Sequence, residues 1–397
     1  MAKLVYALRM TPALDKPAMR PARPFFSSGP CAKPPGFDVA KLSSALLGRY
    51  HRSPAGAARL KEAIALTAEL LEIPESHRIA ITPASDTGAV EMAMWSMLGA
   101  RPVQLLSFDV FGATWVADAV KQLKLDAEAL EAPPGRLPDL SRVRPDCDLV
   151  FPWNGTTSGV RVPDAGFISA GREGMVICDA TSAVFAQDLD WSKLDAVTFS
   201  WQKALGGEAA HGMIVLGPRA VARLEAYDPP WPLPKIFRLK KGGKVDAALF
   251  EGSTINTPSM LCVEDWIACL RWAESMGGLE GLRRRCDASA GMLAEWVEQT
   301  GWVDFLAEDP ATRSNTSVCL RFADPQVAAG PEAEQRRLAA AMAELLEKEG
   351  VAFDVVGHRE APPGLRIWCG PTVDSDDVMA LTPWLDWAYG EVTTVPA

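Results

Sequence analysis

Three groups of polar residues in this sequence directly follow short apolar segments. Lys203 comes after the apolar run 196–199, Asp179 ends the run MVIC, and the sequence SDT at residues 85–87 follows the run 79–81 and opens a helical segment. Each group also has an ordinary structural explanation. A lysine at a strand end often extends into solvent, an aspartate in DATS can form a turn, and SDT can cap a helix.

The pairing of Asp179 with Lys203 is more informative than either residue alone. The lysine follows the aspartate by 24 residues, and each stands at the end of a predicted strand. Ligands of open α/β sheets collect at the carboxyl ends of the strands. A lysine there can form a Schiff base with an aldehyde once burial lowers its pKa, and an aspartate can keep a pyridine nitrogen protonated. The pair therefore predicts a pyridoxal 5'-phosphate site, with Lys203 as the catalytic residue.

The elements that would position these residues alternate between helix and strand. Residues 55–72 place apolar side chains at helical spacing, and a second helix follows SDT. Short apolar runs suit strands that are buried on both faces. They occur at residues 79–81, 103–106, 149–151, 175–178, 196–199 and 213–216. This alternation predicts an α/β fold with a mostly parallel, doubly wound sheet.

The predicted organisation has three parts. Residues 1–36 form an N-terminal arm, residues 37–275 a large cofactor-binding domain, and residues 276–397 a small C-terminal α+β domain. Within these parts we expect a long loop at 229–243, which is rich in proline, tryptophan, lysine and glycine, and a helix at 333–348.

Composition excludes several classes of function. The chain has 397 residues, 48% hydrophobic and 23% charged, which is typical of a globular protein, and no apolar run reaches the ~18 residues of a membrane span. Its net charge of −10 argues against general nucleic-acid binding. Four histidines without metal-ligand spacing predict no metal site. Eight scattered cysteines without CxxC indicate reduced thiols, and we expect a cytoplasmic protein.

Several segments, in order along the chain, resemble the phosphoserine aminotransferase family of fold type I pyridoxal phosphate enzymes. The resemblance runs from about residue 24 to residue 383. The segments that carry it are FSSGP (26–30), RYHRSP (49–54), WNGTTSG (153–159), CDATSA (178–183), SWQKALGG (200–207), INTPS (255–259) and GHREAPPGLR (357–366).

The resemblance implies a role for each residue of a cofactor site. Lys203 would carry the cofactor as a Schiff base, Asp179 would pair with its pyridine nitrogen, and Trp115 would stack on its ring. Thr156 would contact the ring hydroxyl of the cofactor, and Gln202 would contact its phosphate. Ser85, Asp86 and Thr87 would form a cup around the phosphate, which Asn256 and Thr257 of a partner subunit would complete. The last contribution would make a homodimer with shared active sites. Trp115 can also be an ordinary core residue, since the chain has 13 tryptophans.

Two His-Arg pairs are implied to bind substrate. They are His51 with Arg52 and His358 with Arg359. In the family context they suggest a cationic pocket for a substrate phosphate, because arginine contacts phosphate with two parallel hydrogen bonds. Arg366 resembles the residue that holds the substrate α-carboxylate. Many family members have a glycine-rich run with an arginine at the phosphate cup. This chain has ASDTG, so Ser85, Thr87 and backbone N–H groups must serve instead.

The implied reaction is a ping-pong transamination. Glutamate would give its amino group to the cofactor, and 3-phosphohydroxypyruvate would receive it as O-phosphoserine, in serine biosynthesis. The four-carbon phosphorylated substrate of pyridoxine biosynthesis is a second option. Alternatives of the same fold are an alanine–glyoxylate type aminotransferase and a cysteine desulfurase. Cys369 in WCGP is predicted to be core, which disfavours the desulfurase. A non-catalytic nucleotide-binding protein would need GxGxxG after the first strand, and the sequence has none.

Overall fold

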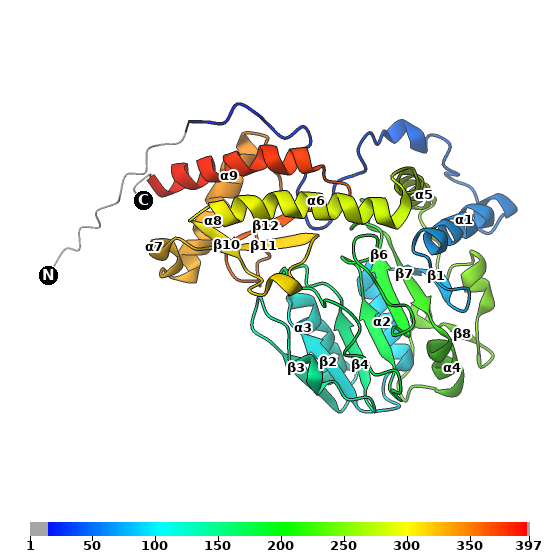
Figure 1. Cartoon of the computed structure of the whole chain (residues 1–397). Coiled ribbons are helices and arrows are strands. Elements are labelled where there is room, and N and C mark those ends of the chain that lie inside the picture. The colour runs from blue at the N-terminus through cyan, green and yellow to red at the C-terminus, as the bar shows by residue number, and fades with distance from the viewer. Residues whose placement is uncertain (1–14, 395–397) are drawn as a thin grey trace.

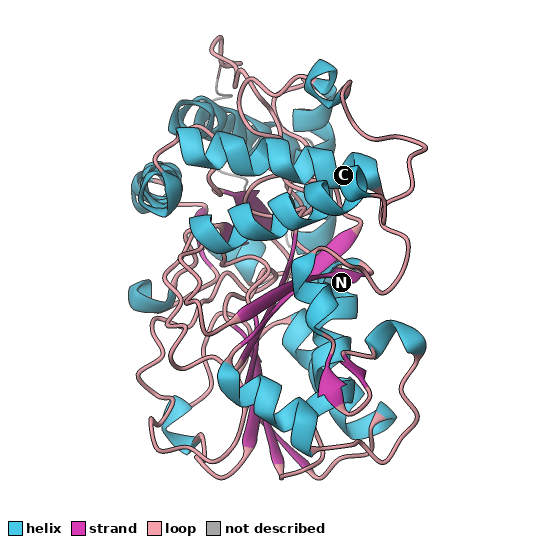
Figure 2. Ribbon diagram, turned by 90° about the vertical axis from the view of Figure 1, so that its right-hand side faces the viewer, coloured by secondary structure: helices cyan, strands magenta, loops and turns pink. Residues whose placement is uncertain are grey.

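A computed structural model describes residues 15–394. Its central feature is a seven-stranded sheet in the order β1-β7-β6-β5-β4-β2-β3, which twists between layers of helix (Figure 2). The strands are β1 (Arg78–Pro83), β2 (Val103–Ser107), β3 (Ala127–Glu131), β4 (Asp148–Pro152), β5 (Val176–Asp179), β6 (Ala196–Ser200) and β7 (His211–Leu216). Neighbours from β3 to β6 are parallel, and β7 alone runs antiparallel to both β6 and β1.

Alternate residues of each strand enter two different hydrophobic cores. In β4, Leu149 and Phe151 pack with the core that includes α1 (Pro54–Leu70) and α5 (Met260–Ser275). Val150 packs on the other face with α2 (Ser85–Met97) and α4 (Pro218–Ala226). Because both faces are covered, the strands are almost continuously apolar. This confirms the predicted doubly wound α/β fold.

The C-terminal part of the chain builds a second sheet. Its strands are β10 (Val303–Phe305), β11 (Ser317–Phe322) and β12 (Leu365–Trp368), paired antiparallel in that order. The helices that pack on it are α6 (Gly278–Gln299), α8 (Glu332–Lys348) and α9 (Ser375–Thr394). Helices α8 and α9 lie beside the small sheet (Figure 1), whereas the start of α6 also packs, through Leu279 and Leu282, in a core of the large sheet. Short elements complete the chain, namely α3 (Val110–Ala117), α7 (Pro325–Ala328), β8 (Lys240–Lys241) and β9 (Lys244–Val245).

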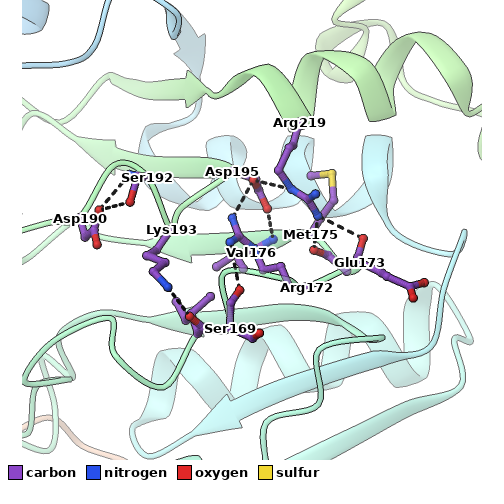
Figure 3. Close-up of polar contacts among 12 residues, drawn as sticks. Ser169, Arg172, Glu173, Met175, Val176, Asp190, Ser192, Lys193, Asp195 and Arg219 are labelled. Atoms are coloured by element: carbon purple, nitrogen blue, oxygen red, sulfur yellow. Dashed lines mark hydrogen bonds and ion pairs between the residues drawn. The ribbon is translucent and has the colours of Figure 1, made fainter.

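An ion-pair cluster around the buried Asp195 lies at the amino end of the large sheet. Asp195 lies immediately before β6 and accepts hydrogen bonds from the Val176 N–H at 2.8 Å and from Arg172 Nη2 at 3.0 Å (Figure 3). Arg219 Nε lies 3.1 Å from the same carboxylate. The cluster ties β5, β6 and α4 together at the edge of the sheet opposite the strand ends discussed below.

The predicted elements agree with the structure in most places. The helix expected at 55–72 is α1 and the helix expected at 333–348 is α8. Strand β3 was missed, and the predicted loop 229–243 contains part of the short β8–β9 hairpin. VAFDVVG forms only isolated bridges, at Phe353 and Val356. The predicted domain limits stay a prediction, and residues 1–14 of the arm lie outside the described residues.

Two further observations concern residues 15–394 only. No helix there is both long enough and apolar enough to cross a membrane. That part of the chain also contains no group of three or more His, Cys, Asp or Glu side chains arranged to hold a metal ion.

Candidate active site

A cavity of about 230 Å³ opens at the carboxyl ends of the strands. Strands β1, β2, β4, β5 and β6 end at the same edge because they run in the same direction, so the polar residues that follow them converge. The cavity is lined by all the predicted cofactor contacts other than the two in INTPS, namely Ser85, Asp86, Thr87, Trp115, Thr156, Asp179, Gln202 and Lys203.

Lys203 is buried, and its Nζ donates a hydrogen bond to the Ser28 carbonyl at 2.5 Å. Burial lowers the pKa of the Lys203 amine, and the nearby charge of Arg366 lowers it further, against the opposing effects of Cys31 and the carboxylates. A lowered pKa increases the fraction of free amine, which is the nucleophilic form. Gly29 makes room for this lysine, because a Cβ there would lie 2.5 Å from Nζ.

Asp179 is held by two donors. The Thr181 N–H binds Oδ1 at 3.1 Å, and Trp115 Nε1 binds Oδ2 at 3.2 Å. These bonds fix the orientation of the carboxyl group. Trp115 was expected from the family resemblance to stack on a ring, and the structure adds this hydrogen bond, which the sequence did not indicate.

The SDT segment begins helix α2 in an unusual conformation. Ala84 and Ser85 both have left-handed backbone angles, with φ of 63° and 52°. Gly212 in β7 allows this close approach, because a Cβ there would lie 2.2 Å from the Ser85 carbonyl oxygen. Within the described chain no side chain caps this helix start, so the first N–H groups of α2 are left for an anion. The expectation that the SDT side chains cap the helix was wrong.

The side chain of Asp86 lies beside Asp179. It is buried, and burial together with the charge of Asp179 raises its pKa well above the usual range. Asp109, at the start of α3, accepts hydrogen bonds from Gly112 N–H at 2.8 Å and Thr157 Oγ1 at 3.4 Å. Burial nevertheless raises the pKa of Asp109 to about 6.

Several residues that contribute to the cavity were not predicted individually. Asn154 donates from Nδ2 to Ser182 Oγ at 2.9 Å, and Thr156 Oγ1 donates to the same hydroxyl at 2.9 Å. The unpredicted lining residues are Gly29, Pro30, Phe111, Pro152, Asn154, Thr181, Ser200 and Ala209. Gly29, Pro30, Asn154, Thr181 and Ser200 lie within segments that carry the family resemblance, so those segments were the available signal.

The predicted substrate residues fall into two locations. Arg366 in β12 reaches the cavity wall, with Nη1 3.5 Å from the Thr156 carbonyl oxygen. His358 lies near it, since its ring centroid is 6.2 Å from that of the cavity residue Phe111. The Arg359 side chain is 86% exposed and pairs with Glu360 at 3.4 Å.

The other four predicted residues, His51, Arg52, Asn256 and Thr257, lie together away from the cavity. Arg52 Nη2 donates to the Thr254 carbonyl at 3.2 Å, which joins the His51–Arg52 pair to the segment of Asn256 and Thr257. His51 is buried beside Tyr50, while Asn256 and Thr257 are exposed. None of the four is among the residues that line the cavity of the described chain. Arg366, His358 and Arg359 are not lining residues either, although Arg366 and His358 contact residues that are.

Protein-family profiles give no match to the chain. Comparison with individual proteins establishes the family. A phosphoserine aminotransferase of Methanosarcina barkeri is 51% identical over 378 residues, which covers 95% of this chain and 100% of the relative. The chain belongs to the phosphoserine aminotransferase family. Its predicted membership is thereby confirmed.

Solved structures agree on the fold and do not separate the activities. A phosphoserine aminotransferase from Bacillus circulans subsp. alkalophilus matches with a TM-score of 0.76 and 19% identity, covering 92% of this chain and 98% of that one. An alanine–glyoxylate aminotransferase from Nostoc sp. also matches with a TM-score of 0.76, at 18% identity, covering 94% and 97%. The choice between phosphoserine aminotransferase and its fold relatives therefore rests on sequence identity and on the site.

The cysteines bear on the desulfurase alternative. Seven of the eight are buried, and Cys262 is partly exposed on α5. Cys369 is fully buried, and burial raises its pKa to about 12. Because a thiolate is the reactive form of cysteine, Cys369 is a structural residue and not a nucleophile.

Proposed function

We propose that this chain is a pyridoxal 5'-phosphate-dependent aminotransferase that moves an amino group between glutamate and 3-phosphohydroxypyruvate, giving O-phosphoserine and 2-oxoglutarate. The observation that carries the proposal is the buried Lys203 opposite an anchored Asp179 in one cavity, in a chain 51% identical to a phosphoserine aminotransferase. A cytoplasmic location is part of the proposal and rests on the family resemblance.

The cavity fits the cofactor. Lys203 has the space that Gly29 leaves, Asp179 presents a carboxylate, and the start of α2 presents N–H groups to a phosphate. We assign the ring hydroxyl contact to Thr156 and a further phosphate contact to Gln202, as the resemblance implies. When bound, the cofactor supplies an electron sink for the bond that breaks at the substrate α-carbon.

The chain's own residues supply binding and proton transfer. Arg366 would hold the substrate α-carboxylate at the cavity wall, and the indole N–H of Trp115 keeps Asp179 oriented. Once displaced by the substrate amine, Lys203 Nζ would take the proton from the substrate α-carbon as a general base. His358 and Arg359 would bind the distal phosphate or γ-carboxylate.

The His51–Arg52 pair supports a homodimer with shared sites. His51, Arg52, Asn256 and Thr257 gather in one place outside their own chain's cavity, in keeping with a role in a partner's cavity. Large apolar side chains are exposed close by in sequence, at Val39, Leu47, Tyr50 and Leu261. Such exposure is typical of a surface that another chain covers.

Substrate profiling of purified protein with pyridoxal phosphate tests the activity. O-phosphoserine and glutamate should each change the absorbance of the bound cofactor, whereas alanine should not. Borohydride should fix the cofactor covalently on the wild-type chain and not on Lys203→Ala. Conversion by alanine but not by O-phosphoserine would instead favour the alanine–glyoxylate alternative. Comparison of three-carbon and four-carbon phosphorylated oxo acids identifies the preferred acceptor.

Mixed dimers test the shared site. Lys203→Ala and Arg52→Ala should each lose most activity alone. Co-expressed, half of the dimers are mixed, and each mixed dimer has one intact site if Arg52 acts on the partner's cavity, so about one quarter of wild-type activity should return. If no activity returns, Arg52 does not act in the partner's site.

A further inference from the structure

Two carboxyl groups share one wall of the cavity. Asp86 comes from the first turn of α2 and Asp179 from the end of β5, and both side chains are at least 94% buried. Both residues line the same cavity, and the charge of Asp179 acts strongly on Asp86. Two ionised carboxylates cannot share such a site without strong repulsion, so one of them must hold a proton.

The hydrogen-bond partners decide which carboxyl group holds the proton. Both oxygens of Asp179 accept hydrogen bonds, from the Thr181 N–H and from Trp115 Nε1. No N–H or O–H donor within residues 15–394 reaches Oδ1 of Asp86. Donors stabilise the ionised form of a carboxyl group, so Asp179 is the carboxylate.

The other ionisable groups around the pair do not reverse this assignment. Lys203 acts on both carboxyl groups from the turn after β6. The Cys178 thiol is next to Asp179 in sequence but packs in the core on the opposite face of β5. Asp109 faces Asp179 from the start of α3 and adds negative charge. Burial is the largest influence on Asp86 and raises its pKa, followed by the neighbouring Asp179, while the Thr198 hydroxyl and Lys203 have smaller opposing effects.

We propose that Asp86 is a positioning residue that stays a neutral carboxylic acid at physiological pH and donates its proton to Asp179. The pair then carries one negative charge, which matches one protonated ring nitrogen. A neutral Asp86 also leaves the N–H groups at the start of α2 without a competing anion, and it avoids a second carboxylate that would favour the charged form of Lys203. The role of Asp86 in cofactor binding rests on the proposed function. The protonation of Asp86 does not, because it follows from the chain's own residues.

Infrared spectroscopy of the cofactor-loaded full chain, with ¹³C-labelled aspartate carboxyl groups, tests the proton directly. At pH 8 the wild type should show the carbonyl stretch of a protonated aspartic acid, and Asp86→Asn should lose it. Asp109→Asn is the matched control and should keep the band, because the pKa of Asp109 of about 6 leaves that residue ionised at pH 8. A wild type without the band, or a band that survives in Asp86→Asn, would overturn the proposal.

Cofactor affinity of the two Asp86 variants tests the positioning role. Asparagine can still donate to Asp179 and carries no charge, so Asp86→Asn should bind pyridoxal phosphate within about threefold of wild type. Asp86→Ala should bind roughly tenfold more weakly, the equivalent of one hydrogen bond to a charged acceptor. Equal weakening by both substitutions would mean that Asp86 acts as a carboxylate. Neither readout involves an amino donor or oxo acid, so failure here leaves the proposed transamination standing.

Discussion

Substitution of Gly29 by alanine should lower the catalytic activity strongly while the chain still folds. Gly29 has φ of +147°, and a Cβ there would lie 2.5 Å from Lys203 Nζ, 3.0 Å from Cε and 3.4 Å from Cδ. Ordinary contacts begin near 3.4 Å, so the amine must move by about 1 Å. The lysine end is flexible and can move, which is why we expect the chain to fold while the amine leaves its reacting position.

The expected magnitudes follow from these distances. A misplacement of about 1 Å at a reacting group costs on the order of 100-fold in rate, so kcat/KM with O-phosphoserine should fall by about that factor. Alanine in this backbone region also costs about 1–3 kcal/mol of strain, which should appear as a lower free energy of unfolding. Borohydride should fix less cofactor on Gly29→Ala than on wild type in the same time.

Gly36→Ala is the control. Gly36 also has a positive φ, of +71°, but no atom of the described chain lies within 4 Å of the added Cβ. The Gly36→Ala variant should lose about 1–2 kcal/mol of stability, the cost of a left-handed conformation for alanine, and keep its kcat/KM. If Gly29→Ala retained kcat/KM within threefold of wild type and fixed cofactor normally, the inferred fit between Gly29 and Lys203 would be wrong.

Three further predictions concern other contacts. Trp115→Phe removes the indole donor to Asp179, 3.2 Å away, and should weaken cofactor binding about tenfold in an absorbance titration; unchanged affinity would contradict the role of that bond. Asp195→Ala leaves two arginines without their buried carboxylate and should lower the free energy of unfolding by about 3–5 kcal/mol in urea, with kcat/KM of the folded protein unchanged because the cavity is at the opposite edge of the sheet. Burial lowers the pKa of His211, whose Nε2 accepts the Ser259 N–H at 3.0 Å. The stabilisation from the neutral His211 side chain is therefore complete above pH ~6.5 and declines as the pH falls below that value. Between pH 8 and pH 5, the free energy of unfolding should fall less for His211→Gln than for wild type.

Local sequence patterns were sufficient for most of the fold. Apolar runs of strand length predicted six of the seven large-sheet strands, because strands covered on both faces have apolar residues at nearly every position. Strand β3 was missed because it lies at the edge of the sheet and four of its five residues are only partly buried or exposed. Its sequence therefore lacks the continuous apolar pattern.

The cofactor site was predictable to the level of which segments meet. Parallel strands bring their carboxyl ends to one edge, so Asp179 and Lys203 could be paired from their positions after two strands. The same argument placed Ser85–Thr87 at the cavity. It could not place Asn256 and Thr257, because the segment that holds them does not follow a strand of the sheet.

The sequence by itself was sufficient to predict the α/β class, the pairing of Lys203 with Asp179, and the family. These depend on local periodicity and on motifs that lie within a few residues of a strand end. Only the tertiary structure decided what the lysine and the aspartate touch. The Ser28 carbonyl meets Lys203 across 175 residues of sequence, and the Trp115 N–H meets Asp179 across 64 residues. Asp86 and Asp179 line one cavity because β1 and β5 run in the same direction and end at the same edge of the sheet. Strand order and side-chain direction set these contacts, and neither is encoded in the local pattern of a single strand.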